Sequence, residues 1–128
     1  MEMLHVEGTR STPEIHFAPD DGTLNISGES YPENSFAFYQ PLHAWIVEFL
    51  SGNSGAVALN IGLSYLNTGS TKCLLDILDI LEEAFAAGRD VKINWYCDHE
   101  NDRAVEAAEE FAEEVTMPFN IIPIGEAL

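Results

Sequence analysis

Between residues 56 and 97 the chain alternates short β-rich runs with one amphipathic helical pattern, and this alternation restricts the fold more than any other feature. The run AVALNIGL (56–63) predicts a strand that is buried on both faces, and DVKINWYC (90–97) predicts the next strand. Between them, apolar residues recur at helical spacing until Gly88: Leu74, Ile77, Leu78, Ile80, Leu81, Ala84 and Phe85. This pattern predicts two parallel strands joined by a crossover helix.

The segment before this unit adds a hairpin and a helix. EIHFA and TLNIS flank the turn sequence PDDG, which predicts a β-hairpin over residues 14–28 at the antiparallel edge of the sheet. Apolar residues at helical spacing then predict a helix between Pro32 and Leu50. Pro41 falls inside this pattern, so the helix either kinks there or has its regular part starting there.

The segment after this unit adds one further helix and a short strand. A helix is expected from about Asn101, with an apolar stripe that includes Ala108 and Phe111, and FNIIPI at residues 119–124 is a last strand. The predicted order is therefore β-β-α-β-α-β-α-β. That order is typical of an α/β fold with a mixed sheet, and 128 residues is the length of one domain, expected to span residues 1–128.

The charge of the chain disfavours several classes of partner. Twenty-two acidic residues against five basic ones give a formal net charge of -17, which repels nucleic acid and anionic membrane surfaces alike. Eight of the acids lie between Asp98 and Glu114, opposed there only by Arg103. This acidic face is first interpreted as a solvated helix surface, and second as a docking surface for a basic partner.

The N-terminus and the two cysteines indicate a cytoplasmic protein. The first ten residues, MEMLHVEGTR, carry two glutamates where a signal peptide has basic residues, and no apolar run approaches the roughly 20 residues that cross a bilayer. Cys73 and Cys97 form no CxxC pair, so we expect small buried groups in a reducing compartment rather than a disulfide. No sequence feature calls for a cofactor.

Three polar loops follow strands that are expected to end at the same edge of the sheet. They are SYPENS (30–35), SYLNTGS (64–70) and CDHENDR (97–103). Because open α/β sheets place their sites where the carboxyl ends of parallel strands meet, these loops predict one composite surface.

Enzyme chemistry finds little support in these loops. The four histidines are scattered, and no phosphate-binding glycine motif occurs. A calcium-loop register from Asp98 has Arg103 where glycine is needed. A small metal-dependent enzyme using Asp98, His99 and Asp102 is kept as an alternative from a different class.

The stretch LNTGS marks the entry into the central helix. Asn67, Thr68 or Ser70 is suited to cap the free N–H groups of the first turn. An exposed hydroxyl at this position is also suited to accept a phosphate, whose charge the helix N-terminus stabilises.

The segments GESYPENS, YLNTGSTK, WYCDHENDRAVEAAEEF and MPFNI together resemble the SiaC family of bacterial regulatory phosphoproteins over nearly the whole chain. The resemblance implies a fold similar to STAS domains, and Thr68 as the phosphoacceptor of a dedicated Ser/Thr kinase and a PP2C-type phosphatase. It also implies a protein that is no enzyme itself. Its unphosphorylated form would bind and activate a diguanylate cyclase, raising cyclic di-GMP and promoting aggregation or biofilm growth.

The residues expected to contact protein partners come from the three loops. They are Tyr31, Pro32, Glu33, Asn34, Tyr65, Asn67, Gly69, Ser70, Asp98, Glu100, Asn101, Asp102 and Arg103. The chain departs from the expected family pattern at Gly69, where a small hydroxyl residue is expected, and at Cys97 and His99. An anti-sigma-factor antagonist that sequesters an anti-sigma kinase is the alternative within the same class.

Overall fold

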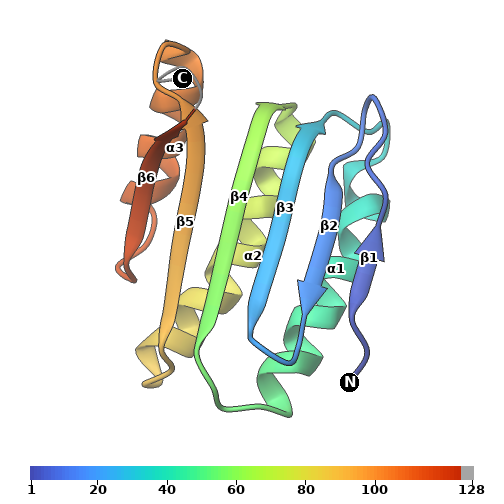
Figure 1. Cartoon of the computed structure of the whole chain (residues 1–128), viewed down its shortest axis with the longest axis vertical. Coiled ribbons are helices and arrows are strands. Elements are labelled where there is room, and N and C mark those ends of the chain that lie inside the picture. Colours follow the sequence, from blue (N-terminus) through green and yellow to red (C-terminus); the bar gives the residue numbers. More distant parts are fainter. Residues whose placement is uncertain (125–128) are drawn as a thin grey trace.

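The computed structural model describes residues 1–124, in which six strands form one sheet in the order β1-β2-β3-β4-β5-β6 (Figure 1). The strands are β1 (Leu4–Val6), β2 (Glu14–Ala18), β3 (Thr23–Ser30), β4 (Val57–Leu66), β5 (Val91–Asp98) and β6 (Phe119–Ile124). β1, β2 and β3 pair antiparallel, and β3 to β6 pair parallel. The predicted mixed sheet is confirmed.

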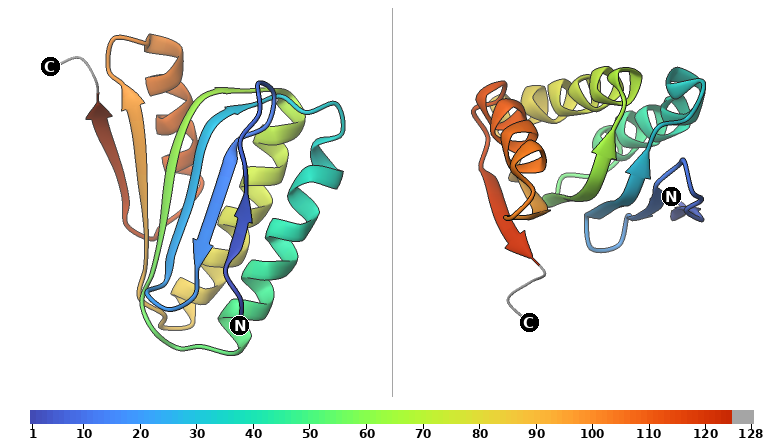
Figure 2. Two further views of the ribbon diagram at one scale, coloured as in Figure 1. Left: turned by 45° about the vertical axis from the view of Figure 1, so that its right-hand side comes forward. Right: turned by 90° about the horizontal axis from the view of Figure 1, so that it is seen from above.

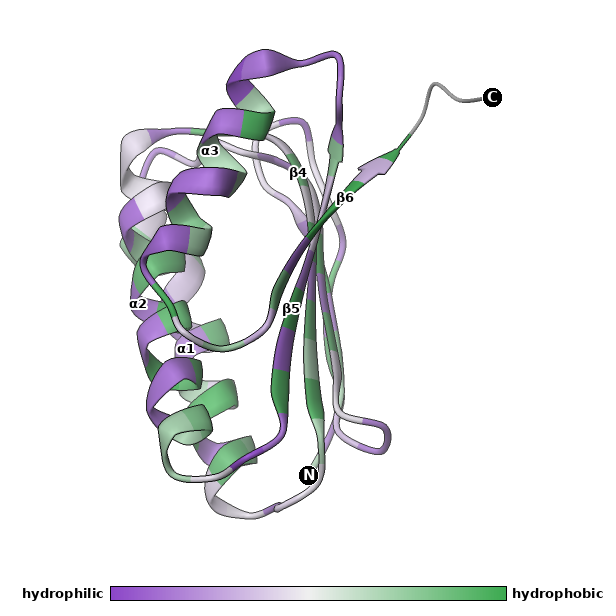
Figure 3. Ribbon diagram, turned by 90° about the vertical axis from the view of Figure 1, so that its left-hand side faces the viewer, coloured by the Kyte–Doolittle hydropathy of each residue, from purple (hydrophilic) through white to green (hydrophobic). Residues whose placement is uncertain are grey.

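The helices α1 (Ser35–Ser51), α2 (Thr68–Ala86) and α3 (Asp102–Glu113) all cover the same face of the sheet (Figures 2 and 3). α1 packs along α2, whereas α3 packs on β5 and β6. Since side chains alternate along a strand, each strand sends one set of residues into the core beneath the helices and the other set to an uncovered face.

The core takes alternate residues from each strand, so the prediction that the 56–63 strand is buried on both faces is wrong: β4 is covered on one face only, because all three helices lie on the same side of the sheet (Figure 3). Ile15 and Phe17 of β2, and Leu59 and Ile61 of β4, are fully buried on the helix side. The apolar stripe of α2 meets them, with Leu74, Ile77, Leu78 and Leu81 all buried. Burial of this stripe stabilises α2, because a helix of this length gains most of its stability from tertiary packing.

The elements differ from the prediction in several places. β1 was not predicted, because a strand of three residues is too short to show an alternation. β4 runs on to Leu66, so Ser64 and Tyr65 belong to a strand rather than to a loop. α1 begins at Ser35 and continues through Pro41, so a start at Pro41 is wrong. The missing N–H of this proline removes one helical hydrogen bond without ending the helix.

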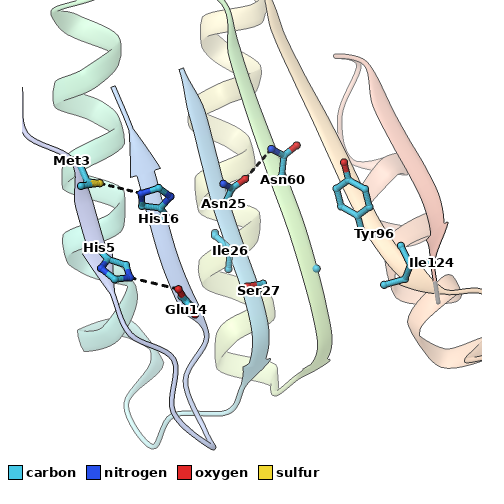
Figure 4. A pocket seen from close by; sticks show the side chains of 11 residues that line it. Met3, His5, Glu14, His16, Asn25, Ile26, Ser27, Asn60, Tyr96 and Ile124 are labelled. Carbon is cyan, nitrogen blue, oxygen red and sulfur yellow. Dashed lines mark hydrogen bonds and ion pairs between the residues drawn. The ribbon is translucent and has the colours of Figure 1, made fainter. Parts of the chain in front are cut away.

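The uncovered face carries a row of hydrogen-bonded asparagines across the four parallel strands. Asn60 Nδ2 donates to Asn25 Oδ1 (2.8 Å), Asn94 Nδ2 to Asn60 Oδ1 (2.9 Å), and Asn120 Nδ2 to Asn94 Oδ1 (3.0 Å). These residues are direct register partners. On the antiparallel strands, His5 and His16 continue this polar row, as Figure 4 shows beside the Asn25–Asn60 bond.

The sheet forks between β4 and β5 toward its carboxyl-terminal edge. Pairing of β4 with β5 ends at Ile61 and Trp95, whereas β3 follows β4 up to Leu66 and β6 follows β5 up to Asp98. The gap between the two ribbons is visible in Figure 1. The second predicted loop therefore follows the end of β4 and the third follows the end of β5, on opposite sides of this fork.

Candidate partner-binding site

The first two predicted loops meet at the edge of the sheet and are joined through Asn67. The Asn67 backbone N–H donates to Ser30 O (2.9 Å), and its side-chain Nδ2 donates to Pro32 O (3.2 Å). Nearby, the rings of Tyr31 and Tyr65 meet edge to face, with centroids 5.8 Å apart. Tyr65 is half exposed, so an aromatic pair lies at the surface beside α2.

Asn67 is the residue that caps α2. Its Oδ1 accepts from Ser70 N (2.8 Å) and from Ser35 Oγ (3.3 Å). Thr68 is the first helical residue and is exposed. Within residues 1–124 its hydroxyl makes no hydrogen bond with another residue. Of the three residues suited to capping, Asn67 is the one that caps the helix. The Thr68 hydroxyl, at the positive end of the helix, is therefore not needed for the cap.

Ser70 belongs to a buried network beneath this surface. Ser30 Oγ lies 2.7 Å from Ser70 Oγ and 2.7 Å from the Tyr39 hydroxyl. Burial raises the pKa of Tyr39 to about 12, with the two serine hydroxyls acting in the opposite direction. Ser70 is fully buried and Pro32 is also buried. Ser70 and Pro32, two of the residues predicted to contact partners, are therefore buried beneath the exposed residues of the loops and support them.

Gly69 allows the first turns of α1 and α2 to touch. A Cβ added at Gly69 would lie 2.7 Å from Ser35 Oγ and 3.0 Å from Ser35 Cβ. These distances are shorter than side chains tolerate, so Ser35 would have to move. The departure from the expected hydroxyl residue thus has a local physical reason, which is the close approach of Ser35 to the start of α2.

The third predicted loop joins the surface on the other side of α2. Asp98 Oδ1 accepts from Glu100 N (2.9 Å), and Asn101 Oδ1 caps α3 by accepting from Ala104 N (3.2 Å). Asn101 and Arg103 line one cleft together with Tyr65. The expected convergence of the three loops is therefore observed, and Asp98, Glu100 and Asp102 of the third loop are exposed.

The metal-enzyme alternative finds no ligand set in the described part of the chain. No group of three His, Cys, Asp or Glu side chains that could hold a metal ion occurs in residues 1–124, so Asp98, His99 and Asp102 do not form one. Cys73 and Cys97 are free thiols in regular elements. Burial raises the pKa of each thiol, aided by Asp76 and Asp98 respectively, which favours the unreactive protonated form.

One surface residue beside the start of α2 was missed from the sequence. Phe36 is 73% exposed although it is the second residue of α1. With Lys72 and Gly69 it lines a shallow depression of about 310 Å³ between the first turns of α1 and α2. Phe36 lies outside the apolar stripe of its helix, and this offset is the signal that could have identified it as a surface aromatic.

Comparison with known proteins decides the family. The family model described as SiaC family regulatory phosphoprotein matches residues 6–124. The chain belongs to the SiaC family. A curated relative from Pseudomonas aeruginosa is 44% identical over 121 residues, covering 94% of this chain and 96% of the relative. Family membership agrees with the predicted resemblance.

Solved structures of SiaC from Pseudomonas aeruginosa share this fold. Apo-SiaC superposes with a TM-score of 0.92 at 43% identity, covering 95% of this chain and 99% of that one. SiaC in complex with the diguanylate cyclase SiaD, described there as the cyclase that SiaC activates, gives a TM-score of 0.92 at 43% identity and covers 94% and 99%. Over residues 1–124 of this SiaC-family chain, no helix is long and apolar enough to span a membrane.

Proposed function

We propose that this chain is a non-enzymatic phosphoswitch whose unphosphorylated form binds and activates a diguanylate cyclase. Thr68 is the switch residue, modified by a Ser/Thr kinase and restored by a PP2C-type phosphatase, and the output is cyclic di-GMP-dependent aggregation or biofilm growth. The observation that carries the proposal is the exposed hydroxyl of Thr68 at the start of α2, which has no hydrogen-bond partner among residues 1–124. The cyclase complex of the P. aeruginosa relative favours this partner class.

The fold is suited to carry a phosphate at Thr68. Asn67 holds the cap of α2, so modification of the Thr68 hydroxyl breaks no hydrogen bond with the described residues. A phosphate there faces the first free N–H groups of the helix, whose partial positive charge is favourable for an anion. Phosphorylation therefore alters the surface and leaves the fold in place.

A bound partner distinguishes the two states by the cost of desolvation. A neutral hydroxyl needs one hydrogen bond, worth about 1 kcal/mol net. A phosphate brings a charge of about -1.5 to -2, and burying it without cations costs several kcal/mol. Lys72 borders the depression beside Gly69, and Arg103 lies across α2 in the cleft. Two peripheral cations do not neutralise that charge in a chain of net charge -17.

Calorimetric titration of the cyclase against four forms tests the proposal. The unmodified protein and Thr68→Ala are expected to bind, and phospho-Thr68 to bind at least about a hundredfold more weakly, because about 2.7 kcal/mol corresponds to that factor. Thr68→Glu should fall between them, since it carries a single charge. Ser54→Glu, an exposed position in the loop at the opposite edge of the sheet, adds the same charge and should bind normally. Equal affinities for the phosphorylated and unmodified forms would contradict the switch.

A further inference from the structure

A second feature of the same edge is a cleft of about 360 Å³ at the fork of the sheet. Its walls are apolar and come from β4, β5 and α3: Leu63, Trp95, Ala104, Ala107 and Phe111. Its mouth carries Tyr65, Asn101 and Arg103. The cleft thus begins under the three-loop surface and runs down between α2 and α3.

Trp95 in this cleft has an unused hydrogen-bond donor. Its side chain is 1% exposed and stacks on Phe111 (centroids 4.9 Å apart) and on Phe119 (6.0 Å). Among the described residues, its Nε1 is the one buried side-chain polar atom without a hydrogen-bond partner. Buried indole N–H groups normally find an acceptor, which for Trp95 has to come from outside the described residues.

The strands beside Trp95 also have free pairing capacity. β4 and β5 stop pairing with each other at Ile61 and Trp95, although both strands continue for three or more residues. The backbone edges that face each other across the fork therefore lack ladder hydrogen bonds with one another. Such unpaired strand edges are places where a second chain can form hydrogen bonds.

The charges around the cleft select the sign of its occupant. Glu110 and Arg103 line the cleft, Glu106, Glu109 and Glu113 lie elsewhere on the same short helix α3, and Glu114 is its C-cap. Arg103 is the single base within that acidic stretch. This field repels an anionic ligand and attracts a cationic one.

We infer that the cleft receives a cationic amphipathic segment of the cyclase. An apolar side chain of that segment packs against Trp95 and Phe111, an acceptor oxygen takes the hydrogen bond of Trp95 Nε1, and flanking Lys or Arg residues face the acids of α3. The inference rests on the proposed function and names the surface and the partner chemistry that go with it. Thr71, one turn along α2 from Thr68, lines the cleft, so an occupant would end beside the switch residue.

The indole N–H of Trp95 reports occupancy directly. The chain has two tryptophans, and Trp45 Nε1 already donates to Glu2 O (2.9 Å), so Trp45→Phe assigns the two indole signals in a ¹H–¹⁵N TROSY spectrum. Adding unlabelled cyclase should move the Trp95 indole proton downfield, as a new hydrogen bond does, and leave the Trp45 signal in place.

A filling substitution and its matched control complete the test. Ala107→Leu fills part of the cleft with a side chain that favours helix, and it should weaken cyclase binding tenfold or more. Ala86→Leu adds the same atoms at an exposed position at the end of α2. This control should bind the cyclase within twofold of wild type. Normal cyclase binding with an unchanged Trp95 signal, and no effect of Ala107→Leu, overturns the cleft and leaves the Thr68 switch standing. A wild-type protein that does not bind the cyclase at all overturns both.

Discussion

The two sides of α2 differ in how they are closed. On the α1 side, Ser30, Tyr39 and Ser70 form a buried hydrogen-bonded network, and Gly69 brings the first turns of both helices into contact. On the α3 side, the cleft separates the N-terminal ends of α2 and α3. Toward the C-terminal ends of the two helices, the Glu82 carboxylate accepts hydrogen bonds from the backbone N–H groups of Thr116 and Met117 and from the Thr116 hydroxyl.

This difference follows from the side chains that each neighbour contributes. The space between α1 and α2 is filled by large side chains of α1, which are all buried: Tyr39, Leu42 and Ile46. α3 is short and presents Ala104 and Ala107 to the cleft. Small side chains cannot fill the space between diverging elements at the density of a protein interior. Thr68 therefore stands at the junction of a closed seam and an open cleft, where a partner can be recognised without disturbing the core.

The largest expected effect comes from a leucine-to-alanine substitution made once in the closed core and once in the wall of the cleft. Leu78 is fully buried in the closed core, whereas Leu63 lines the cleft. Leu78→Ala should reduce the free energy of unfolding by about 3 to 5 kcal/mol, because it leaves a dry cavity as well as losing apolar burial. Leu63→Ala should cost about 1 to 2 kcal/mol less, because it only widens a cleft that is already open. Urea denaturation of both variants measures this, and equal losses would mean that the cleft is as closed as the core.

An intermediate effect is expected for Tyr39→Phe, which removes one member of the buried network. At neutral pH the loss should be about 1 kcal/mol. The pKa of Tyr39 is about 12 in the folded protein against 10.0 for its ordinary value. The unfolded chain therefore releases this proton first, and wild-type stability falls as pH rises from about 10 to about 12, by up to about 1.4 kcal/mol per unit.

In Tyr39→Phe this contribution is absent, so the stability difference from wild type should shrink and then reverse as the pH rises. Denaturation at a series of alkaline pH values provides the measurement. Tyr96→Phe, on the uncovered face of β5 (Figure 4), serves as the reference variant. Parallel alkaline curves for wild type and Tyr39→Phe would show that the network is open to water.

The smallest effect is expected for Glu82→Gln, which changes the hydrogen bonds between α2 and the segment after α3. Hydrogen bonds from the Thr116 hydroxyl lower the pKa of Glu82, with backbone N–H groups of Thr116 and Met117 contributing. A lowered pKa stabilises the fold above the ordinary value of 4.5, and this contribution is lost as the pH falls through the folded-state pKa. Glu82→Gln should thus cost less than about 1 kcal/mol near pH 7, since the group is near the surface.

Urea titrations at pH 7 and at successively lower pH values separate these hydrogen bonds from packing. The cost of Glu82→Gln should be present at pH 7 and should shrink as the pH falls through the lowered pKa of the wild-type carboxyl. Glu83→Gln, the exposed neighbour on the same helix, should have no such dependence. A pH-independent cost would mean that shape, rather than the charged hydrogen bonds, connects the two elements.

Much of the fold and of the site could be predicted from local patterns. The stripe of α2, the alternation in β2 and β3 and the turn before Thr23 each depend on neighbours in sequence, and each was confirmed. The three loops were predicted to converge, because parallel strands with helical crossovers end at one edge. The motifs of those loops were also sufficient for the family, which the comparisons confirm.

Only the tertiary structure decided which polar residues at that edge are surface and which are support. Asn67, Thr68 and Ser70 are equivalent capping candidates in sequence. In the structure Asn67 caps the helix, Ser70 is buried against Ser30, and the Thr68 hydroxyl has no hydrogen-bond partner in the described part of the chain. The fork beyond Trp95 was equally hidden, because strand pairing depends on residues more than 30 positions apart. Local spacing determines which face a side chain takes within its own element, but hydrogen-bond partners and clefts arise from the packing of distant elements, which no short segment encodes.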